Sequence, residues 1–331
     1  MTSTSSSSDT LGSRGYRARV QAIPASHTGN WKLIGLPLII SLVVFAVLPG
    51  ILVPLLRLVL PGAPDEFVSP TTAVAMFLTV VLGALMMIKV SGLSWEALGF
   101  TRDRWAPRAA LGVALGVGLL TLVGLIITLA GGTSITWAFT ASAAAPILVA
   151  AVFFAVQGIW EELIYRAYLM PHLTKRFHAP VAIIVTSLLF TAGHAANPGM
   201  GFIPVLNLTV FGFVFALLYY RTGNIWITGL AHAAWNFSQG YIFGAEVSGK
   251  QVKGSFFEST ALPGKEIISG GSFGFEGSIV TTIAGLVLIA LMVWFWPARR
   301  PSPSSGDGAQ QPDVDRPSTS DDGLSMPPTA P

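Results

Sequence analysis

The sequence predicts an all-α polytopic membrane protein with about eight transmembrane helices and a polar site inside the bundle. Of the 331 residues, 52% are hydrophobic and only 11% are charged, with a mean hydropathy of +0.65. Soluble domains carry roughly 25% charged residues. The apolar residues form separate stretches long enough to cross a bilayer. One of these stretches nevertheless contains Glu161, Glu162 and Arg166, charges that are costly at membrane depth and therefore indicate a functional site.

Polar tails flank the apolar region. Residues 1–30 are rich in Ser and Thr and include Arg14, Arg17 and Arg19, without the apolar core and cleavage site of a signal peptide. We expect a disordered, basic N-terminal tail there. Residues 299–331 are rich in Pro, Ser, Asp and Gly, so a disordered C-terminal tail is expected as well. The eight-helix membrane domain is then expected over residues 31–298.

Apolar stretches separated by turn and charged residues place the spans in order. We predict them at 33–60, 71–90, 109–130, 145–170, 179–196, 202–220, 225–243 and 278–296. A short interfacial helix is expected in the segment that links the second and third spans. The third span contains Gly112 and Gly116 at a spacing that permits close helix packing. The fourth span is expected to extend past Pro171 to Phe177 as an amphipathic continuation.

Eight spans place both termini on the same side of the membrane, and the basic residues select the side. On the N-terminal side lie Arg14, Arg17, Arg19, Lys32, Lys89, Arg102, Arg104, Arg108, Lys175, Arg176, Arg221, Arg299, Arg300 and Arg316. The other side has Lys250, Lys253 and Lys265. This bias predicts that both termini are cytoplasmic. The net charge of +3 is too small and too scattered to predict a nucleic-acid partner.

Helical spacing divides the charges of the fourth span. Glu162 and Arg166 are four residues apart, so they share a face and can form a structural ion pair. Glu161 points about 100° away from Glu162. Its neighbours one turn away are Gln157 and Tyr165, which are polar but uncharged. Glu161 is therefore the candidate catalytic base.

Further polar residues lie in other spans: His194 in the fifth, and His232 with Asn236 in the seventh, four residues apart. A glutamate and a histidine can deprotonate a water, and a second histidine with an asparagine can stabilise an oxyanion. These residues thus favour hydrolysis. The chain has no cysteine, no GxSxG or HExxH motif, and no aspartate inside a span, so nothing favours a covalent, zincin or aspartyl mechanism.

The ordered motifs Glu161-Glu162-x-x-x-Arg166, Phe190-x-x-x-His194 and His232-x-x-x-Asn236 resemble those of the CPBP family. This family comprises CAAX proteases and bacteriocin-processing enzymes, including type II CAAX prenyl endopeptidases. The resemblance covers about residues 145–243.

It implies an intramembrane endopeptidase in which Glu161 and His194 activate a water. His232 and Asn236 would form the oxyanion site, and Glu162 with Arg166 would hold the helix. Family members are commonly described as metalloproteases, and Glu161, His194 and His232 could bind one divalent metal such as Zn²⁺. A metal-free mechanism is slightly preferred.

The predicted spans leave one geometric conflict, because they put Glu161 near the cytoplasmic end of its helix and His194 near the outer end of the next. An extended fourth span would remove the conflict. Two other functions remain open: a non-catalytic bacteriocin-immunity or scaffold protein of the same fold, and a proton-coupled transporter. As partners we expect membrane lipid and a membrane-associated peptide or protein. The composition suggests a bacterial cell membrane, and it does not reveal whether the substrate is prenylated.

Overall fold

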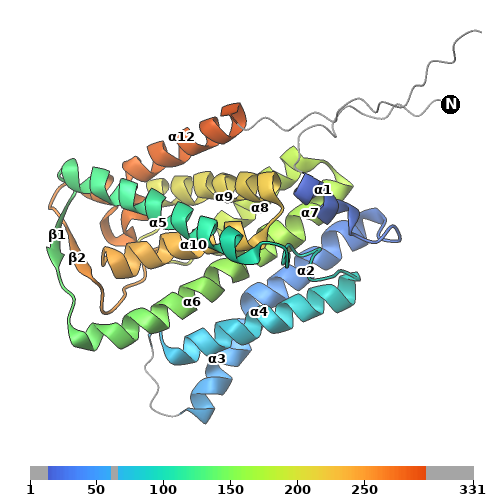
Figure 1. The fold of residues 1–331 in the computed structure, drawn as a ribbon, viewed down its shortest axis with the longest axis horizontal. Coiled ribbons are helices and arrows are strands. Elements are labelled where there is room, and N and C mark those ends of the chain that lie inside the picture. Colours follow the sequence, from blue (N-terminus) through green and yellow to red (C-terminus); the bar gives the residue numbers. More distant parts are fainter. Residues whose placement is uncertain (1–13, 61–65, 296–331) are drawn as a thin grey trace, which may run out of the picture. The chain divides into compact units, whose positions relative to one another are not determined.

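The protein is mainly helical, with one small antiparallel sheet. The computed structural model describes residues 14–60 and 66–295, so the predicted C-terminal tail lies outside the described residues (Figure 1). The elements in order are α1 Arg14–Gln21, η1 Trp31–Gly35, α2 Leu36–Leu42, η2 Val43–Val47, α3 Leu48–Val59, α4 Pro70–Ser91, α5 Trp105–Leu129, β1 Thr133–Trp137, η3 Ala141–Ala143, α6 Ala144–Glu162, η4 Leu163–Leu169, α7 Met170–Arg176, α8 Ala179–Gly193, α9 Phe202–Thr222, α10 Ile225–Phe237, η5 Ser238–Ile242, β2 Phe257–Ala261, α11 Glu266–Ser269, η6 Gly271–Phe273, η7 Phe275–Gly277 and α12 Ile279–Phe295.

Five helical segments in the described residues are long and apolar enough to cross a membrane: Trp31–Val59, Pro70–Ser91, Trp105–Leu129, Ala141–Arg176 and Phe202–Thr222. The chain is thus an integral membrane protein. The other three predicted spans coincide with shorter helices, α8, α10 with η5, and α12. At about 1.5 Å per residue, the 15 residues of α8 cover about 22 Å, less than the roughly 30 Å hydrocarbon core. The number of eight spans stays a prediction.

The linker between α4 and α5 and the segments of β1 and β2 differ from the sequence prediction. The linker expected to hold an interfacial helix forms turns between α4 and α5 instead. Strands β1 and β2, which pair from Thr133 with Ala261 to Trp137 with Phe257, add a small sheet to a fold predicted to be all-α. Alternation of apolar residues over only five positions is too short a signal to identify such strands from the sequence.

The N-terminal segment expected to be disordered contains the helix α1. Its Tyr16 is buried, and the hydroxyl lies 2.6 Å from Thr174 Oγ1. Arg19 Nε donates to the carbonyl oxygen of Gly223. Behind α1, Lys175 Nζ donates to the carbonyl of Ile23. These contacts with distant segments order a stretch whose composition alone predicts disorder.

Helix α10 packs between α5 and α6 through glycines on both neighbours (Figure 1). A Cβ atom on Gly116 of α5 would lie 2.2 Å from the carbonyl oxygen of Ala231, and one on Gly158 of α6 would lie 2.5 Å from the amide nitrogen of Ala233. Only glycine permits this approach. The close packing sets α10, which carries His232 and Asn236, directly against α6, which carries Glu161.

The helix that carries Glu161 runs without interruption from Ala141 to Arg176, and α8 turns back from Ala179. Glu161 lies 15 residues before Arg176, and His194 lies 15 residues after Ala179. Two helices of equal length that share a turn return to the same level. The depth conflict expected from the sequence is thereby removed, because the fourth span extends to Arg176.

Candidate active site

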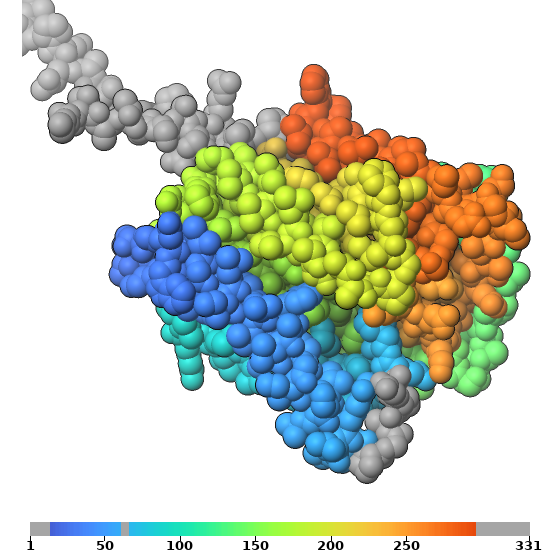
Figure 2. All heavy atoms as spheres, turned by 180° about the vertical axis from the view of Figure 1, so that it is seen from behind, coloured from blue at the N-terminus to red at the C-terminus, as the bar shows by residue number. Residues whose placement is uncertain are grey.

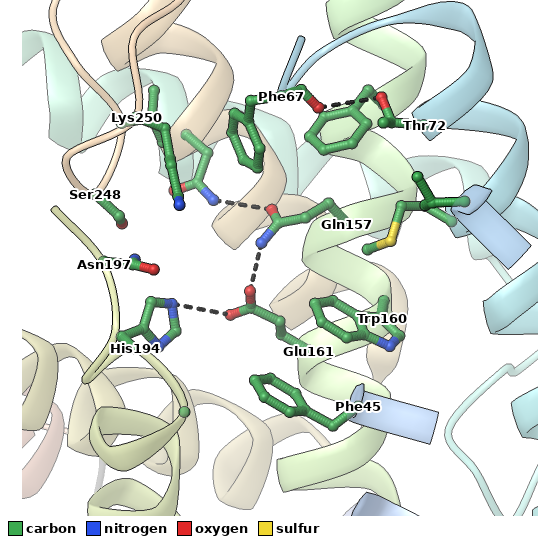
Figure 3. A pocket seen from close by; sticks show the side chains of 16 residues that line it. Phe45, Phe67, Thr72, Gln157, Trp160, Glu161, His194, Asn197, Ser248 and Lys250 are labelled. Carbon is green, nitrogen blue, oxygen red and sulfur yellow. Dashed lines mark hydrogen bonds and ion pairs between the residues drawn. The ribbon is translucent and has the colours of Figure 1, made fainter. Parts of the chain in front are cut away.

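Glu161 lies at the inner wall of a cavity of about 270 Å³ (Figure 3). The cavity is lined by Phe45, Val53, Phe67, Thr72, Met76, Phe153, Gln157, Trp160, Glu161, Gly193, His194, Asn197, Asn236, Val247, Ser248 and Lys250. The Glu161 side chain is buried, and the π-helical segment η4 begins two residues after it. Such local widening of an α-helix is frequent at functional sites.

A chain of amides holds one oxygen of the Glu161 carboxylate. Gln157 Nε2 donates to Glu161 Oε1 over 2.5 Å, and Asn236 Nδ2 donates to Gln157 Oε1 over 2.9 Å. Gln157 is one helical turn before Glu161 and therefore on the same face. Glu161 Oε2 accepts no hydrogen bond and is buried. One carboxylate oxygen is thus fixed and the other is left available.

Glu162 belongs to a separate buried network. Its Oε1 atom lies 3.2 Å from Arg166 Nη1 and 3.0 Å from His232 Nδ1. The Glu162 and Arg166 side chains are completely buried. Arg166 also donates to the Gly212 carbonyl, and its guanidinium carbon lies 4.6 Å from the centre of the Phe190 ring. The structure therefore brings the predicted ion pair together and adds His232 to it.

The hydrogen bonds of the two histidines define their tautomers. His194 Nδ1 lies 2.8 Å from the Phe190 carbonyl oxygen, which can only accept, so this nitrogen carries the proton. His232 Nδ1 lies within hydrogen-bond distance of the Glu162 carboxylate, which also can only accept, so this nitrogen carries a proton as well. In the neutral form of each ring Nε2 presents a lone pair, and both Nε2 atoms lie 3.8 Å from Glu161 Oε2.

Three acceptor atoms therefore converge without a proton between them. Neither 3.8 Å separation is a direct hydrogen bond. A single water can bridge the pair Glu161–His194 with two hydrogen bonds of about 2.8 Å each, and both residues line the cavity. The arrangement is suited to hold a water and to take its proton, which is the property of a water-activating hydrolytic site.

A divalent metal is the other species that three such atoms suggest. Glu and two His residues, each with its second nitrogen already bonded, have the chemistry of a zinc site. Ligands about 2.0–2.1 Å from one tetrahedral zinc would lie about 3.3 Å apart, whereas the two separations here are 3.8 Å. Among the described residues no group of three or more His, Cys, Asp or Glu is placed to hold a metal ion. The residues as placed do not fit a zinc ion.

His232 takes a position that its sequence spacing did not indicate. It shares α10 with Asn236, but only Asn236 lines the cavity. The His232 ring stacks on Phe215, with centroids 4.6 Å apart, and its nitrogens face Glu161 and Glu162. The geometry thus favours a positioning role for His232 over the oxyanion role that the resemblance implies.

Other polar residues of the cavity were not predicted as site residues. Asn197 follows His194 by three residues, and Figure 3 shows its amide beside the His194 ring. Ser248 and Lys250 come from a turn far along the chain. The only signal for Gln157 was its place one turn before Glu161. Asn197 lies near a motif residue, whereas no local pattern marks Ser248 or Lys250.

Residues 143–238 match the family model described as type II CAAX prenyl endopeptidase Rce1-like. The matched segment contains all three sequence motifs, and the match confirms the resemblance that these motifs carry. The match supports a CPBP family intramembrane protease. No curated protein matches the chain.

The amide chain predicts a measurable effect of Gln157. Gln157→Leu removes the donor to Glu161 and the acceptor for Asn236 at similar volume, so the carboxylate loses its fixed orientation. We expect kcat for peptide cleavage to fall by about 10- to 100-fold with a small change in KM. Gln251→Leu, at an exposed position, is the matched control and should leave kcat unchanged. Equal kcat for Gln157→Leu and wild type would show that the amide chain does not position Glu161.

Proposed function

We propose that this protein is an intramembrane endopeptidase that hydrolyses a peptide bond of a membrane-associated peptide or protein. The observation that carries the proposal is the convergence of Glu161 Oε2 and His194 Nε2 on one space at the wall of a cavity inside the helix bundle. The family match supports protease activity in general. The assignment of the individual residues rests on their geometry.

In the proposed reaction, a water held between Glu161 and His194 loses a proton to the Glu161 carboxylate. The resulting hydroxide attacks the carbonyl carbon of the scissile peptide bond and forms a tetrahedral oxyanion. The C–N bond then breaks, and the proton held by Glu161 passes to the leaving nitrogen. Glu161 is the general base and then the general acid, while His194 orients the water.

Two amides are available to stabilise the oxyanion. Asn236 uses one Nδ2 proton for Gln157 and retains a second, since an amide nitrogen has two protons. The Asn197 side chain lies on the same side of the cavity as His194 (Figure 3). Such donors act strongly at a developing negative charge in a site with little water. His232 donates its Nδ1 proton to Glu162 and lies beside Glu161.

A second cavity of about 360 Å³ lies between α2 with η2 and η4 with α8, and Phe45 and Gly193 line both cavities. Figure 2 shows the face on which the N-terminal helices lie beside the yellow-green segment that includes α7 and α8. Apart from Ser41 and Tyr165, the residues that line the second cavity are apolar. Such a lining suits a substrate that approaches from lipid. We further propose that both termini are cytoplasmic and that the membrane is bacterial.

The test uses the purified full-length protein in liposomes with a quenched peptide library. His194→Ala should lower kcat/KM by about 10²- to 10⁴-fold, because the water loses one of its two partners. His178→Ala, an exposed histidine at the start of α8, is the control and should be unchanged. Wild-type cleavage is expected to persist after chelation of divalent metals.

Two results would contradict this scheme. Loss of wild-type cleavage on chelation, restored by added Zn²⁺, would make Glu161, His194 and His232 metal ligands after a local rearrangement. Cleavage equal in wild type and His194→Ala would remove the proteolytic site from these residues. No detectable cleavage by the wild type across the library would favour a non-catalytic protein of the same fold.

A further inference from the structure

The side chain of Lys250 brings an ammonium group to the cavity. Among the residues that line the cavity, Lys250 and Glu161 are the two with a carboxylate or ammonium side chain. Figure 3 shows Lys250 entering from the side opposite Trp160, near Asn197 and Ser248. Lys250 lies outside residues 143–238, so the family match assigns it no role.

The backbone that carries Lys250 forms a tight two-residue turn. Val247 and Lys250 exchange both backbone hydrogen bonds at 2.9 Å, and the two residues between them have positive φ, 49° for Ser248 and 78° for Gly249. These values are typical of a type I′ turn, which costs energy for any residue other than glycine. A Cβ atom on Gly249 would lie 1.9 Å from the Pro198 carbonyl oxygen. The turn therefore packs against the loop that follows His194.

Glu276 holds Ser248 in this unfavourable conformation. Its Oε2 atom accepts from the Ser248 backbone nitrogen at 2.8 Å and from the Ser248 hydroxyl at 2.7 Å. Its Oε1 atom accepts from the indole nitrogen of Trp235 in α10 at 3.1 Å. A buried carboxylate thus ties the turn to the helix that carries Asn236. Lys250 projects from a fixed position rather than from a mobile loop.

The ammonium group of Lys250 has no hydrogen bond or ion-pair partner among the described residues, although the side chain is half-buried. Lys253, three residues later, behaves differently, because it is exposed and pairs with Glu66 over 2.8 Å. A fixed, unpaired cation at the edge of a reaction cavity is suited to bind an anion of the substrate.

We propose that Lys250 is a specificity-determining residue that binds a carboxylate of the peptide substrate while the scissile carbonyl lies at Glu161 and His194. This inference rests on the proposed endopeptidase function. The carboxylate is either the C-terminal group of the peptide or an Asp or Glu side chain close to the scissile bond. In both cases the ion pair with Lys250 selects acidic over neutral peptides.

Three versions of one cleavable peptide separate these sources. The first ends in a free carboxylate, the second is its C-terminal amide, and the third is the amide with one Glu added near the scissile bond. The assay in neutral liposomes compares four proteins: the wild type, Lys250→Gln, Lys250→Arg and the control Lys253→Gln. The elution profile and thermal unfolding of each variant establish that it is folded.

We expect the wild type to cleave at least one carboxylate-bearing peptide with a kcat/KM about ten- to a hundredfold above that of the neutral amide. Lys250→Gln should abolish this preference, so that its kcat/KM for the carboxylate-bearing peptide falls to its own value for the neutral amide. Lys250→Arg should retain most of the preference, and Lys253→Gln all of it. The peptide that is preferred identifies the source of the carboxylate.

Equal cleavage of all three peptides by the wild type would overturn the role of Lys250 while the protease assignment stands. The same conclusion follows if Lys250→Gln slows all three peptides by one common factor. A different result would be that neither the wild type nor Glu161→Gln cleaves any of the three peptides or any member of the library. In that case the proposed function fails, and the role of Lys250 fails with it.

Discussion

Glu161→Gln is expected to lower kcat/KM for peptide cleavage by about 10³- to 10⁴-fold. The amide has nearly the same shape and can still accept the hydrogen bond from Gln157, so the site should remain assembled. It cannot accept a proton from water, and the reaction loses both its base and the later proton donor. The measurement is the steady-state cleavage of a quenched peptide in liposomes.

Two comparisons make this expectation specific. Glu258→Gln changes an exposed glutamate on β2 and should leave kcat/KM unchanged. Glu161→Gln should still bind the peptide with an affinity close to that of the wild type, since the cavity keeps its shape. Residual cleavage within tenfold of the wild type would show that Glu161 is not the base.

The second large effect concerns stability. Arg166→Met is expected to lower the free energy of unfolding by about 3–5 kcal/mol, because it leaves the Glu162 carboxylate buried without its counter-charge. The double variant Glu162→Gln/Arg166→Met removes both charges and should recover most of the loss. Unfolding in mixed micelles, followed by circular dichroism, measures the difference.

A surface pair provides the matched control for this prediction. Arg108 and Asp103 lie 3.4 Å apart with side chains 32% and 77% exposed. Arg108→Met should cost less than about 1 kcal/mol, since exposed ion pairs contribute little. If Arg166→Met were no more destabilising than Arg108→Met, the buried carboxylate of Glu162 would not need Arg166 for its stabilisation.

Local patterns account for much of the fold. The predicted span at 202–220 coincides with α9 to within two residues, because a continuous apolar stretch determines both helix and membrane placement. The contact between Glu162 and Arg166 follows from their four-residue spacing alone. The short strands β1 and β2 and the helix α1 could not be predicted, because distant partners stabilise them.

The candidate site, like the fold, is predictable from the sequence only in part. The sequence by itself determined which apolar stretches contain Glu161, His194 and the pair His232 and Asn236. Only the tertiary structure decided that His232 faces the two glutamates and not the cavity, and that Lys250 reaches the cavity from a distant turn. The physical reason is that helical periodicity relates residues within one helix. Which faces of different helices meet depends on packing, such as the approach of Gly116 and Gly158 to α10.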